Sequence, residues 1–568
     1  MSVKVAESKE ETVALNNGEK PQEDILCRII THVGEMGLYQ RVLFAILLYF
    51  GAIFMFVYSV QMFVAATPQE HWCRVPELGH LDQELRRNLS IPGAAQGRDW
   101  DRCLMYDVNW TTVLVNLTPP DPGSPTKPCY DGWEFLFNDI PYATVVSERE
   151  WVCGKASYVP IAQAIFFFGS LIGCILFGWI GDLYGRVPAI VGSNLIGCVG
   201  GVASCFTVGL WDFAFCRFLV GLSNDCCFIM VYILVLEYVG TKHRTWVSNM
   251  SFAISGCVGA TMLPILALWL LDWRKLLLVT SLPMLAALAI PWIVPENARW
   301  LSASGKVDRA ISVLRRFESV NKRRIPDDAI EEFIIVSNNK QETDESLIGL
   351  FKSPPMRSSI MVLILVSMMS GVTIDALIRL SENIGDNFYL TFTLSSISEA
   401  PALIIVTLLL DRVGRRCMIS STLLLTTVLC FACAFVPKGV SQMIAAVLSR
   451  FAVNMSISVQ VQLGTELLPT PVRATGTSLL HVTAFFATAF SPFVVYTGRY
   501  WRPLPLFILV GLTLFACGLA LLLPETKGRP MPQTIVEGEK VVNETLLCRK
   551  PANDEELEDL SHLRRSVE

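Results

Sequence analysis

Five ionisable side chains fall within or beside long apolar stretches of this 568-residue chain, namely Asp225, Asp375, Arg379, Glu399 and Arg450. A charge placed deep in a lipid bilayer is costly, so such residues usually face a partner or a water-filled path. A buried carboxylate offers a partner to an ammonium group, and a guanidinium offers one to a carboxylate. These residues therefore predict recognition of small charged molecules inside a membrane.

Asp225 is the leading candidate for a ligand of positive charge. It precedes an apolar run that begins at Cys226 and reaches Glu237 before the next charge. Phe228 and Tyr232 follow Asp225 by three and seven residues. A helix would bring Tyr232 to the same face as Asp225, where its ring could offer a π surface to a cation.

The alternative for these buried charges is structural neutralisation, in which the groups satisfy one another rather than a substrate. Asp375 and Arg379 are four residues apart and could pair on one helix face. For Asp225 the same alternative stays open.

Composition indicates that membrane helices position these charges. The chain is 52% hydrophobic and only 17% charged, whereas soluble domains carry about 25% charged residues. One crossing of a bilayer needs about 20 apolar residues. We therefore expect an all-α polytopic membrane protein with twelve transmembrane helices in two six-helix halves. The expected spans lie near 41–64, 156–179, 187–209, 213–236, 246–270, 275–294, 358–380, 388–410, 417–437, 439–464, 474–497 and 504–523.

A polar insertion, residues 65–155, separates the first two spans. It contains four cysteines, which predict two disulfides on an oxidising side of the membrane, with three pairings open: Cys73, Cys103, Cys129 and Cys153. It also contains three glycosylation sequons, which begin at Asn88, Asn109 and Asn116. Both features predict that this loop is extracellular.

An extracellular first loop fixes the remaining topology. Twelve spans place both termini in the cytoplasm, together with a central loop rich in arginine and lysine, as the positive-inside rule requires. The net charge of −5 gives no basic surface for nucleic acid. The expected domains are a cytoplasmic segment 1–40, a first half 41–295, the central loop 296–357, a second half 358–525 and a cytoplasmic tail 526–568.

One short motif occurs at the same place in both halves. Residues 178–186 read GWIGDLYGR, and residues 409–416 read LLDRVGRR. Each copy has an acid, a glycine turn and arginine. The acid could bind the N-terminus of a neighbouring helix, and the arginine could clamp a carboxylate. Such pairs can hold a gate shut in one state and release it in another.

This duplicated motif resembles the signature of the major facilitator superfamily. Further segments resemble the organic cation/carnitine/organic anion transporter family, solute carrier family 22, over residues 25–535. They read EWVC at 150–153, PENARWL at 295–301, ELLPTPVRATG at 466–476 and PETKG at 524–528. The resemblance implies the major facilitator fold and alternating access around one central site, without ATP hydrolysis, cofactor or metal.

The resemblance also implies roles for particular residues. Glu399, before Pro401, and Arg450 match charged positions that the family uses near its cavity. A cytoplasmic gating network is implied for Asp182, Arg186, Glu237, Arg244, Glu296, Arg299, Asp411, Arg415, Arg416, Glu466, Arg473 and Glu525. The alternative for the arginines among them is surface charge that sets topology.

Departures from the family pattern leave the substrate open. Phe485 stands where cation carriers tend to have aspartate and where anion and carnitine carriers tend to have arginine. Asp225 stands where some cation carriers have lysine. Ser367 and Ile374 replace aromatic residues of the seventh span.

The function that we expect is secondary transport of small organic cations or zwitterions across the plasma membrane, with substrates resembling carnitine, β-alanine or amine conjugates. An ammonium would meet Asp225 or Glu399, and a carboxylate would meet Arg450 or Arg379. A coupling ion is a further candidate partner. The alternatives are an organic anion exchanger built around the two arginines and a non-transporting receptor that uses the extracellular loop. No P-loop lysine motif, paired metal ligands or nucleophile elbow favours an enzyme.

Overall fold

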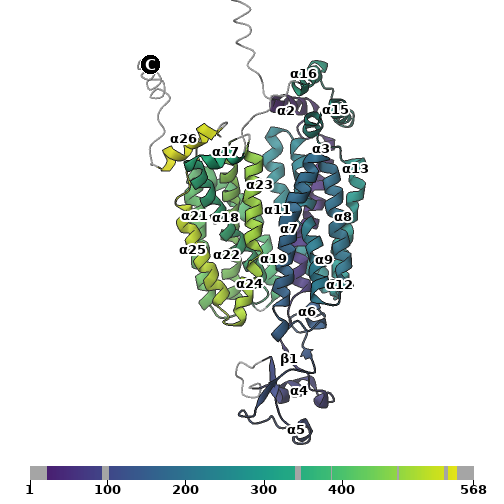
Figure 1. Cartoon of the computed structure of the whole chain (residues 1–568), viewed down its shortest axis with the longest axis vertical. Helices are drawn as coiled ribbons and strands as arrows, with labels where there is room; N and C mark the ends of the chain where they lie inside the picture. Colours follow the sequence, from purple (N-terminus) through teal and green to yellow (C-terminus); the bar gives the residue numbers. More distant parts are fainter. Residues whose placement is uncertain are drawn as a thin grey trace, which may run out of the picture.

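The chain folds as a bundle of long helices (Figure 1) in a computed structural model that describes residues 22–92, 102–338, 347–385, 387–469, 472–529, 532 and 535–546. Within these residues, eleven helical segments are long and apolar enough to cross a membrane, and Leu504–Ala520 is a shorter apolar helix. The expected all-α polytopic fold is therefore confirmed. Because lipid offers no hydrogen bonds, helices that satisfy their own backbone are the structures that such apolar sequences adopt.

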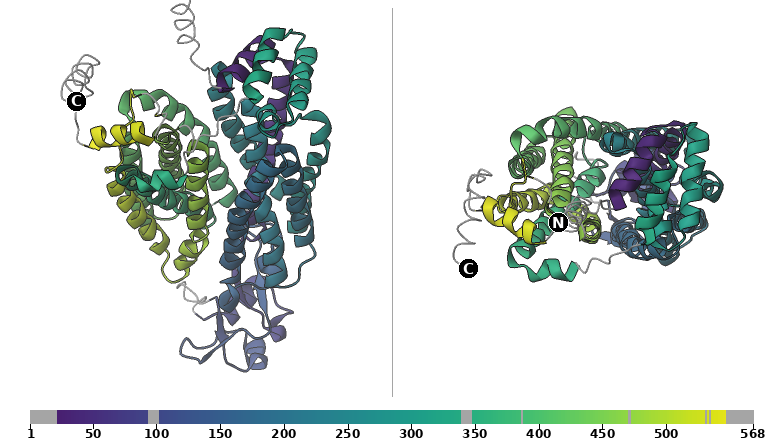
Figure 2. Two further views of the ribbon diagram at one scale, coloured as in Figure 1. Left: turned by 45° about the horizontal axis from the view of Figure 1, so that its top comes forward. Right: turned by 90° about the horizontal axis from the view of Figure 1, so that it is seen from above.

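The apolar helices form two groups, which Figure 2 shows as separate lobes. The first group consists of α3 Leu38–Val64, α7 Tyr158–Leu183, α8 Arg186–Ser204, α9 Leu210–Ser223 with α10 Cys226–Glu237, α11 Thr241–Leu270, and α12 Trp273–Ser281 with η4 Leu282–Ala289 and α13 Ile290–Ile293. The second consists of α18 Pro354–Leu380, α19 Phe388–Ile397 with α20 Glu399–Val413, α21 Arg415–Phe435, α22 Val440–Leu467, α23 Arg473–Thr488 with α24 Ser491–Tyr496 and η6 Thr497–Arg499, and α25 Leu504–Ala520. We call these groups the first and second halves.

Glycines allow α7 and α9 to pack closely in the first half. A Cβ atom added at Gly173 would lie 2.1 Å from the carbonyl oxygen of Leu222. One added at Gly221 would lie 2.1 Å from the carbonyl oxygen of Phe166. Small residues at such crossings let membrane helices come into backbone contact.

One end of the bundle, which we call the loop end, contains the insertion after α3 (Figure 1). Its two antiparallel ladders pair β1 His71–Cys73 with β4 Trp133–Phe135, and β2 Leu104–Tyr106 with β3 Thr126–Pro128. Its short helices are η1 Pro76–Leu78, α4 Gln83–Ser90, α5 Trp110–Asn116, α6 Val145–Glu148 and η3 Cys153–Lys155. We call residues 71–135 the loop domain.

The four cysteines of the insertion form two disulfides, as predicted. Of the three open pairings, the structure has Cys73–Cys129 and Cys103–Cys153. The sequon asparagines lie on the helices of the loop domain: Asn88 is half-buried on α4, whereas Asn109 and Asn116 are exposed at the two ends of α5.

The segment after the loop domain is attached to the first half. Glu148 of α6 accepts two hydrogen bonds of 2.6 Å from the guanidinium of Arg274 and one of 2.8 Å from Trp273 Nε1. Hydrogen bonds from Arg274 hold the pKa of the Glu148 carboxyl below its usual value. Arg149 Nη2 donates to the carbonyl of Thr207 at 2.7 Å.

The opposite end, which we call the cap end, carries short helices outside the spans. They are α2 Gln22–Val33, α14 Ala298–Ala303, α15 Val307–Asn321, α16 Asp327–Asn338, α17 Leu347–Lys352 and α26 Ile535–Leu546. Arg28 of α2 pairs with Glu332 of α16. The backbone N–H of Tyr39 donates to Asn321 Oδ1 at 3.0 Å, which connects α15 to the start of α3.

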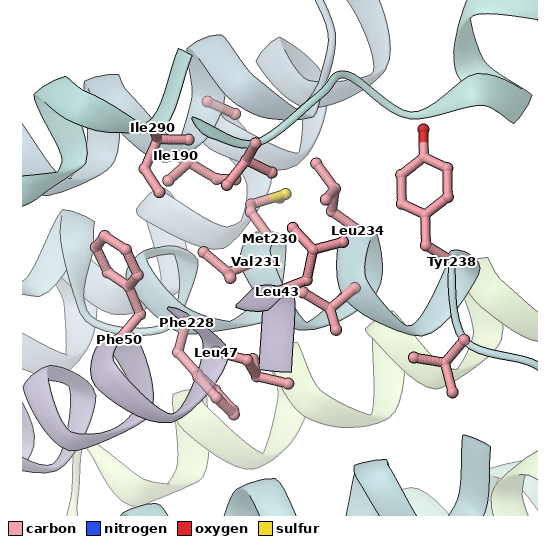
Figure 3. Close-up of a cluster of buried hydrophobic side chains, with 14 of the residues drawn as sticks. Leu43, Leu47, Phe50, Ile190, Phe228, Met230, Val231, Leu234, Tyr238 and Ile290 are labelled. Carbon is pink, nitrogen blue, oxygen red and sulfur yellow. The ribbon is translucent and has the colours of Figure 1, made fainter. Parts of the chain in front are cut away.

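Buried apolar side chains form a separate core in each half and a shared core at the loop end. Figure 3 shows the first core, where Leu43 and Phe50 of α3 lie with Phe228 and Leu234 of α10. The second half has its own core between α18, α20, α21 and α22. At the loop end a third core joins Phe63 and other first-half residues to Phe392 of α19.

Candidate functional site

The two halves are joined at the loop end. The backbone N–H of Thr67, just after α3, donates to Glu382 Oε1 at 2.7 Å, and Gln69 Nε2 donates to the Glu382 carbonyl at 3.1 Å. The ring of Phe63 lies 4.9 Å from that of Phe388 and 5.0 Å from that of Phe392, measured between centroids. These contacts close the loop end with hydrogen bonds and aromatic packing.

The cap end is different, because its charges pair within each half. Among the described residues, no hydrogen bond or ion pair at this end joins the first half to the second. All twelve predicted gating residues lie here, at or near the ends of the helices. They are Asp182, Arg186, Glu237, Arg244, Glu296 and Arg299 in the first half, and Asp411, Arg415, Arg416, Glu466, Arg473 and Glu525 in the second.

In the first half, a carboxylate binds the N-terminus of α8. Glu296 accepts hydrogen bonds from the backbone N–H of Arg186 at 2.8 Å and of Val187 at 3.0 Å. Asp182 instead pairs with the Arg186 guanidinium at 2.7 Å. Glu237 lies near the positive charges of Arg186 and two further arginines, Arg244 and Arg299.

The second half repeats this arrangement. Glu525 accepts from the backbone N–H of Arg415 at 2.9 Å and of Arg416 at 3.0 Å. Arg415 also makes two parallel 3.0 Å hydrogen bonds with Glu466 and a 3.1 Å ion pair with Asp411. Arg473 Nε donates to a backbone carbonyl at 3.2 Å. The motif aspartates thus pair with arginine, while glutamates from elsewhere bind the helix N-termini.

The motif glycines are required by both conformation and space. Gly185 has φ +110° and Gly414 has φ +96°, which L side chains rarely adopt. A Cβ atom at Gly185 would lie 2.4 Å from the Glu296 carboxylate, and one at Gly414 would lie 2.8 Å from that of Glu525. Glycine therefore lets each glutamate reach its helix.

Asp375 and Arg379 form a buried ion pair on α18. Arg379 Nε lies 2.7 Å and its Nη2 3.2 Å from the Asp375 carboxylate oxygens. Tyr58 of α3 donates its hydroxyl to Asp375 Oδ1 at 2.6 Å, and Ser491 of α24 donates to Oδ2. The two groups thus pair with each other, as the structural alternative expects, and Asp375 also takes part in the contact between the halves.

Asp225 lies between α9 and α10 and has few partners. Its Oδ2 accepts a hydrogen bond of 3.2 Å from the thiol of Cys174 on α7. His481 of α23 is an electrostatic neighbour of the carboxylate. Tyr232 instead bonds Ser248 of α11 at 2.5 Å. Asp225 and Tyr232 therefore have different neighbours, although their spacing predicts one helix face. The helix is interrupted between α9 and α10, beside Asp225.

Glu399 and Arg450 lie in the second half. Arg450 Nη1 donates to Ser396 Oγ at 3.1 Å. The guanidinium of Arg450 also interacts electrostatically with Glu399. The Glu399 carboxylate makes no hydrogen bond or ion pair with any described residue. A Cβ atom at Gly256, midway along α11, would lie 3.8 Å from this carboxylate. Glu399 therefore faces the first half.

A row of aromatic rings runs along the first half between the predicted charges. Centroid distances are 5.8 Å for Tyr232–Phe228, 5.6 Å for Phe228–Phe54, 6.4 Å for Phe54–Tyr58 and 6.3 Å for Tyr58–Phe167. Tyr58 then bonds Asp375. The row connects the Tyr232 region to the buried ion pair. Phe228 and Phe167 are 1% and 0% exposed, so the partly buried rings of Tyr232, Phe54 and Tyr58 are the ones that can offer a π face.

Sequence reasoning missed several polar residues of this region. Arg217 is fully buried on α9 and bonds Gln61 of α3. Arg217 is a charged residue inside a predicted span, which is the same criterion that selected the other buried charges. Glu382 follows α18, and burial raises its pKa to about 7. No sequence pattern identified Glu382 or His481.

Comparisons with known proteins agree with this architecture. The profile of the "Sugar (and other) transporter" family matches residues 134–534. The beta-alanine transporter of Drosophila melanogaster is 31% identical over 564 residues, covering 92% of each chain. Solute carrier family 22 member 3 of Rattus norvegicus is 30% identical and covers 89% of this chain and 94% of its own.

A solved structure of the major facilitator superfamily proton:xylose symporter XylE, bound to 6-bromo-6-deoxy-D-glucose, has a TM-score of 0.57. It covers 89% of this chain and 99% of its own, at 14% identity, and so supports the fold alone. The matching profile and the relatives, which align over almost the whole chain, establish the family. This chain belongs to the sugar (and other) transporter family and, within it, to solute carrier family 22.

Proposed function

We propose that the protein is a plasma-membrane carrier that moves small organic cations and zwitterions by alternating access, without catalysing a reaction. The observation that carries this proposal is the Glu399 carboxylate, which faces the first half without a hydrogen bond or ion pair from any described residue. A half-buried carboxylate that accepts no hydrogen bond from a described residue, with only the more distant charge of Arg450 near it, can receive a positively charged ligand. The name of the beta-alanine relative supports the zwitterion class, because β-alanine carries both an ammonium and a carboxylate.

The acidic and basic groups suit the two ends of such a substrate. Among the described residues, a thiol is the one hydrogen-bond donor to the Asp225 carboxylate, so Asp225 is a second candidate for the ammonium group. Arg450 donates to one serine and is the candidate for a carboxylate. Tyr232, which is partly buried, can offer a ring face beside the first-half core, and Phe228 of that core supports it from 5.8 Å, measured between ring centroids. Asp375 and Arg379 already neutralise each other, and we assign them to closing the loop end.

We assign the loop end to the outside of the cell. The support is chemical: two disulfides form in oxidising compartments, and Asn109 and Asn116 are exposed for glycosylation. The cap end and both termini are then cytoplasmic. With this orientation, we propose that the central loop 296–357 is cytoplasmic and connects the membrane-spanning halves 41–295 and 358–525.

In this orientation the arrangement has a closed outer side. Transport requires the loop end to separate, which breaks the contacts of Glu382 with Thr67 and of Asp375 with Tyr58. The cap end must then close, and the two charged clusters are the groups available to exchange partners across it. This is the gating role that we propose for them.

Uptake by cells that express the full chain tests the function. The labelled panel contains a quaternary amine, carnitine, β-alanine, a histamine conjugate and an aromatic carboxylate, each with and without sodium. We expect saturable uptake of amines or zwitterions and its loss in Glu399→Gln. Glu84→Gln, on exposed surface of α4, is the control for expression at the cell surface.

The sodium arm tests whether a coupling ion takes part. Uptake of the aromatic carboxylate alone would instead support an organic anion exchanger. Binding without flux would support a receptor. Uptake of amines that is unchanged in Glu399→Gln and Asp225→Asn would refute the cation site.

A further inference from the structure

Arg217 is a buried cation that pairs with no carboxylate among the described residues. Its side chain is 1% exposed within α9. Its Nε donates to Gln61 Oε1 at 3.1 Å, and its guanidinium lies 5.0 Å from the centroid of the Phe166 ring. Its Nη2 has no hydrogen-bond partner among the described residues. An uncompensated buried charge is strongly destabilising, so this guanidinium calls for a negative partner.

Two further buried donors of this region also lack partners among the described residues. They are Gln61 Nε2 and Arg379 Nη1, on side chains that are 3% and 8% exposed. Gln61 uses its oxygen to bind Arg217, which keeps its amide nitrogen beside that guanidinium.

Arg379 belongs to the same region, although it comes from the second half. Its guanidinium lies 5.5 Å from the ring of Phe167, which is 5.4 Å from the ring of Phe166 beneath Arg217. The two arginines are close enough for their charges to repel. Asp375 pairs with Arg379, and Glu382 also lies near Arg379, whereas no carboxylate of a described residue pairs with Arg217.

We propose that Arg217, Gln61 and Arg379 form an anion subsite between the two halves at the loop end, which takes one small carboxylate or inorganic anion. Guanidinium and amide N–H groups are the donors that bind such anions in proteins. The carboxylate source rests on the proposed function: it would be the acidic end of a zwitterionic substrate, and this subsite would then bind it in place of Arg450. The inorganic source, such as chloride, does not depend on it.

An anion in this subsite would contact both halves at once. Gln61 and Arg217 lie on α3 and α9 of the first half, and Arg379 lies on α18 of the second. Binding would reduce the repulsion between the arginines and hold the loop end closed. A bound anion therefore stabilises the state in which the loop end is sealed.

Thermal unfolding of the purified full-length protein tests the subsite. The starting buffer contains only a bulky sulfonate as anion, and chloride, β-alanine or ethylamine is then added at constant ionic strength. Ethylamine is the matched control, because it is β-alanine without the carboxylate. We expect chloride or β-alanine to raise the Tm of the wild-type protein by about 2–4 °C.

Gln61→Glu is the decisive variant, because it supplies a carboxylate next to Arg217 from within the fold. We expect a higher Tm than wild type in the sulfonate buffer and no further rise with chloride or β-alanine. Arg217→Lys, which keeps the charge but loses the planar donors, should also lose the response. A shift in these tests with chloride alone identifies an inorganic anion, and one with β-alanine identifies the substrate carboxylate.

Two results would overturn the subsite: a wild-type Tm that responds to neither anion, or a response that persists in Gln61→Glu. Uptake of the quaternary amine by the wild-type chain is measured in parallel. If that uptake is present while the anion response is absent, the subsite is refuted and the proposed function stands. If the anion response is present without uptake of any amine or zwitterion, the proposed function fails alone.

Discussion

The two ends of the bundle achieve stability in different ways. At the loop end the halves share an apolar core and hydrogen bonds, as between Thr67 and Glu382. At the cap end the glutamates bind helix N-termini without crossing between the halves: Glu296 binds the N-terminus of α8, and Glu525 binds that of α21. The closed end is thus held by contacts that exist only while the halves touch. At the other end the ion pairs of Arg186 and Arg415 each lie within one half, and no hydrogen bond or ion pair between described residues joins the halves.

This difference explains how one chain could alternate between two states. Separating the loop end exposes apolar surface and breaks hydrogen bonds, so a compensating gain is needed elsewhere. The charged clusters at the cap end could supply it by exchanging partners, which costs little when the competing pairs are similar in strength. The ends are therefore complementary rather than equivalent.

The largest effect that we expect comes from breaking the buried pair at the loop end. Asp375→Asn leaves Arg379 buried without its counter-charge and should destabilise the protein by about 3–5 kcal/mol. Asp411→Asn is the control at the cap end, where the aspartate side chain is 83% exposed, and should change stability little. Thermal unfolding of both variants checks the comparison, and equal losses would contradict it.

The motif glycines test the cap end. Gly185→Ala or Gly414→Ala forces a strained backbone and pushes Glu296 or Glu525 from its helix, at a cost of about 1–3 kcal/mol. We expect a lower maximal uptake rate with a nearly unchanged KM. Gly178→Ala is the matched control, because nothing lies within 4 Å of the added Cβ atom. Normal uptake in both motif variants would argue against gating by these clusters.

The loop end should respond to pH through Glu382. Burial raises its pKa from 4.5 to about 7, and it faces Asp139 and Arg379. Because the raised pKa favours the protonated form, the closed state is most stable below pH 4.5 and loses that stability as pH rises to about 7. His71, which also lies near Asp139, has a pKa lowered to about 4 by burial and does not titrate in most of this window.

Uptake measured against external pH checks this prediction, with Glu382→Gln as the test variant. Glutamine can still accept the hydrogen bond from Thr67 but does not titrate. We expect the variant to lose the pH dependence between pH 4.5 and about 7. If the pH profile of the variant is identical to that of the wild-type protein, Glu382 does not cause the pH dependence of the loop end.

The smallest effect compares the two charged clusters. Arg415→Lys loses one of two parallel hydrogen bonds with Glu466, which should reduce stability by about 1 kcal/mol. Arg186→Lys can keep its single bond with Asp182 and should be milder. The unfolding temperatures of the two variants show which substitution is more destabilising. A larger loss in Arg186→Lys would contradict the stronger bonding of Arg415.

The fold and its charged motifs could be predicted from sequence because each depends on local pattern. Apolar stretches longer than a bilayer crossing identify helices, and the repeat of aspartate, glycine and arginine identifies matching places in both halves. Four cysteines in one polar insertion likewise predicted two disulfides, although only the fold selects Cys73–Cys129 and Cys103–Cys153.

The arrangement of the site depends on contacts between distant segments and was less accessible. Tyr58 and Asp375 meet across the two halves, and no local pattern links them. Asp225 and Tyr232 have different neighbours, because their surroundings depend on helices beyond their own. Glu399 is a candidate from sequence, but spacing does not reveal that its carboxylate accepts no hydrogen bond from the described residues.

The attachment of Glu148 to Arg274 and Trp273 ties the segment after the loop domain to the first half. Its contacts with the second half include Arg499, which donates to the carbonyl of Cys153 and approaches Cys103 Sγ at 3.6 Å. When the loop end opens, the loop domain would therefore move with the first half and lose its contacts with Arg499. An antibody fragment bound to the loop domain alone would still allow the transport cycle, whereas one that also bound the second half would stop transport.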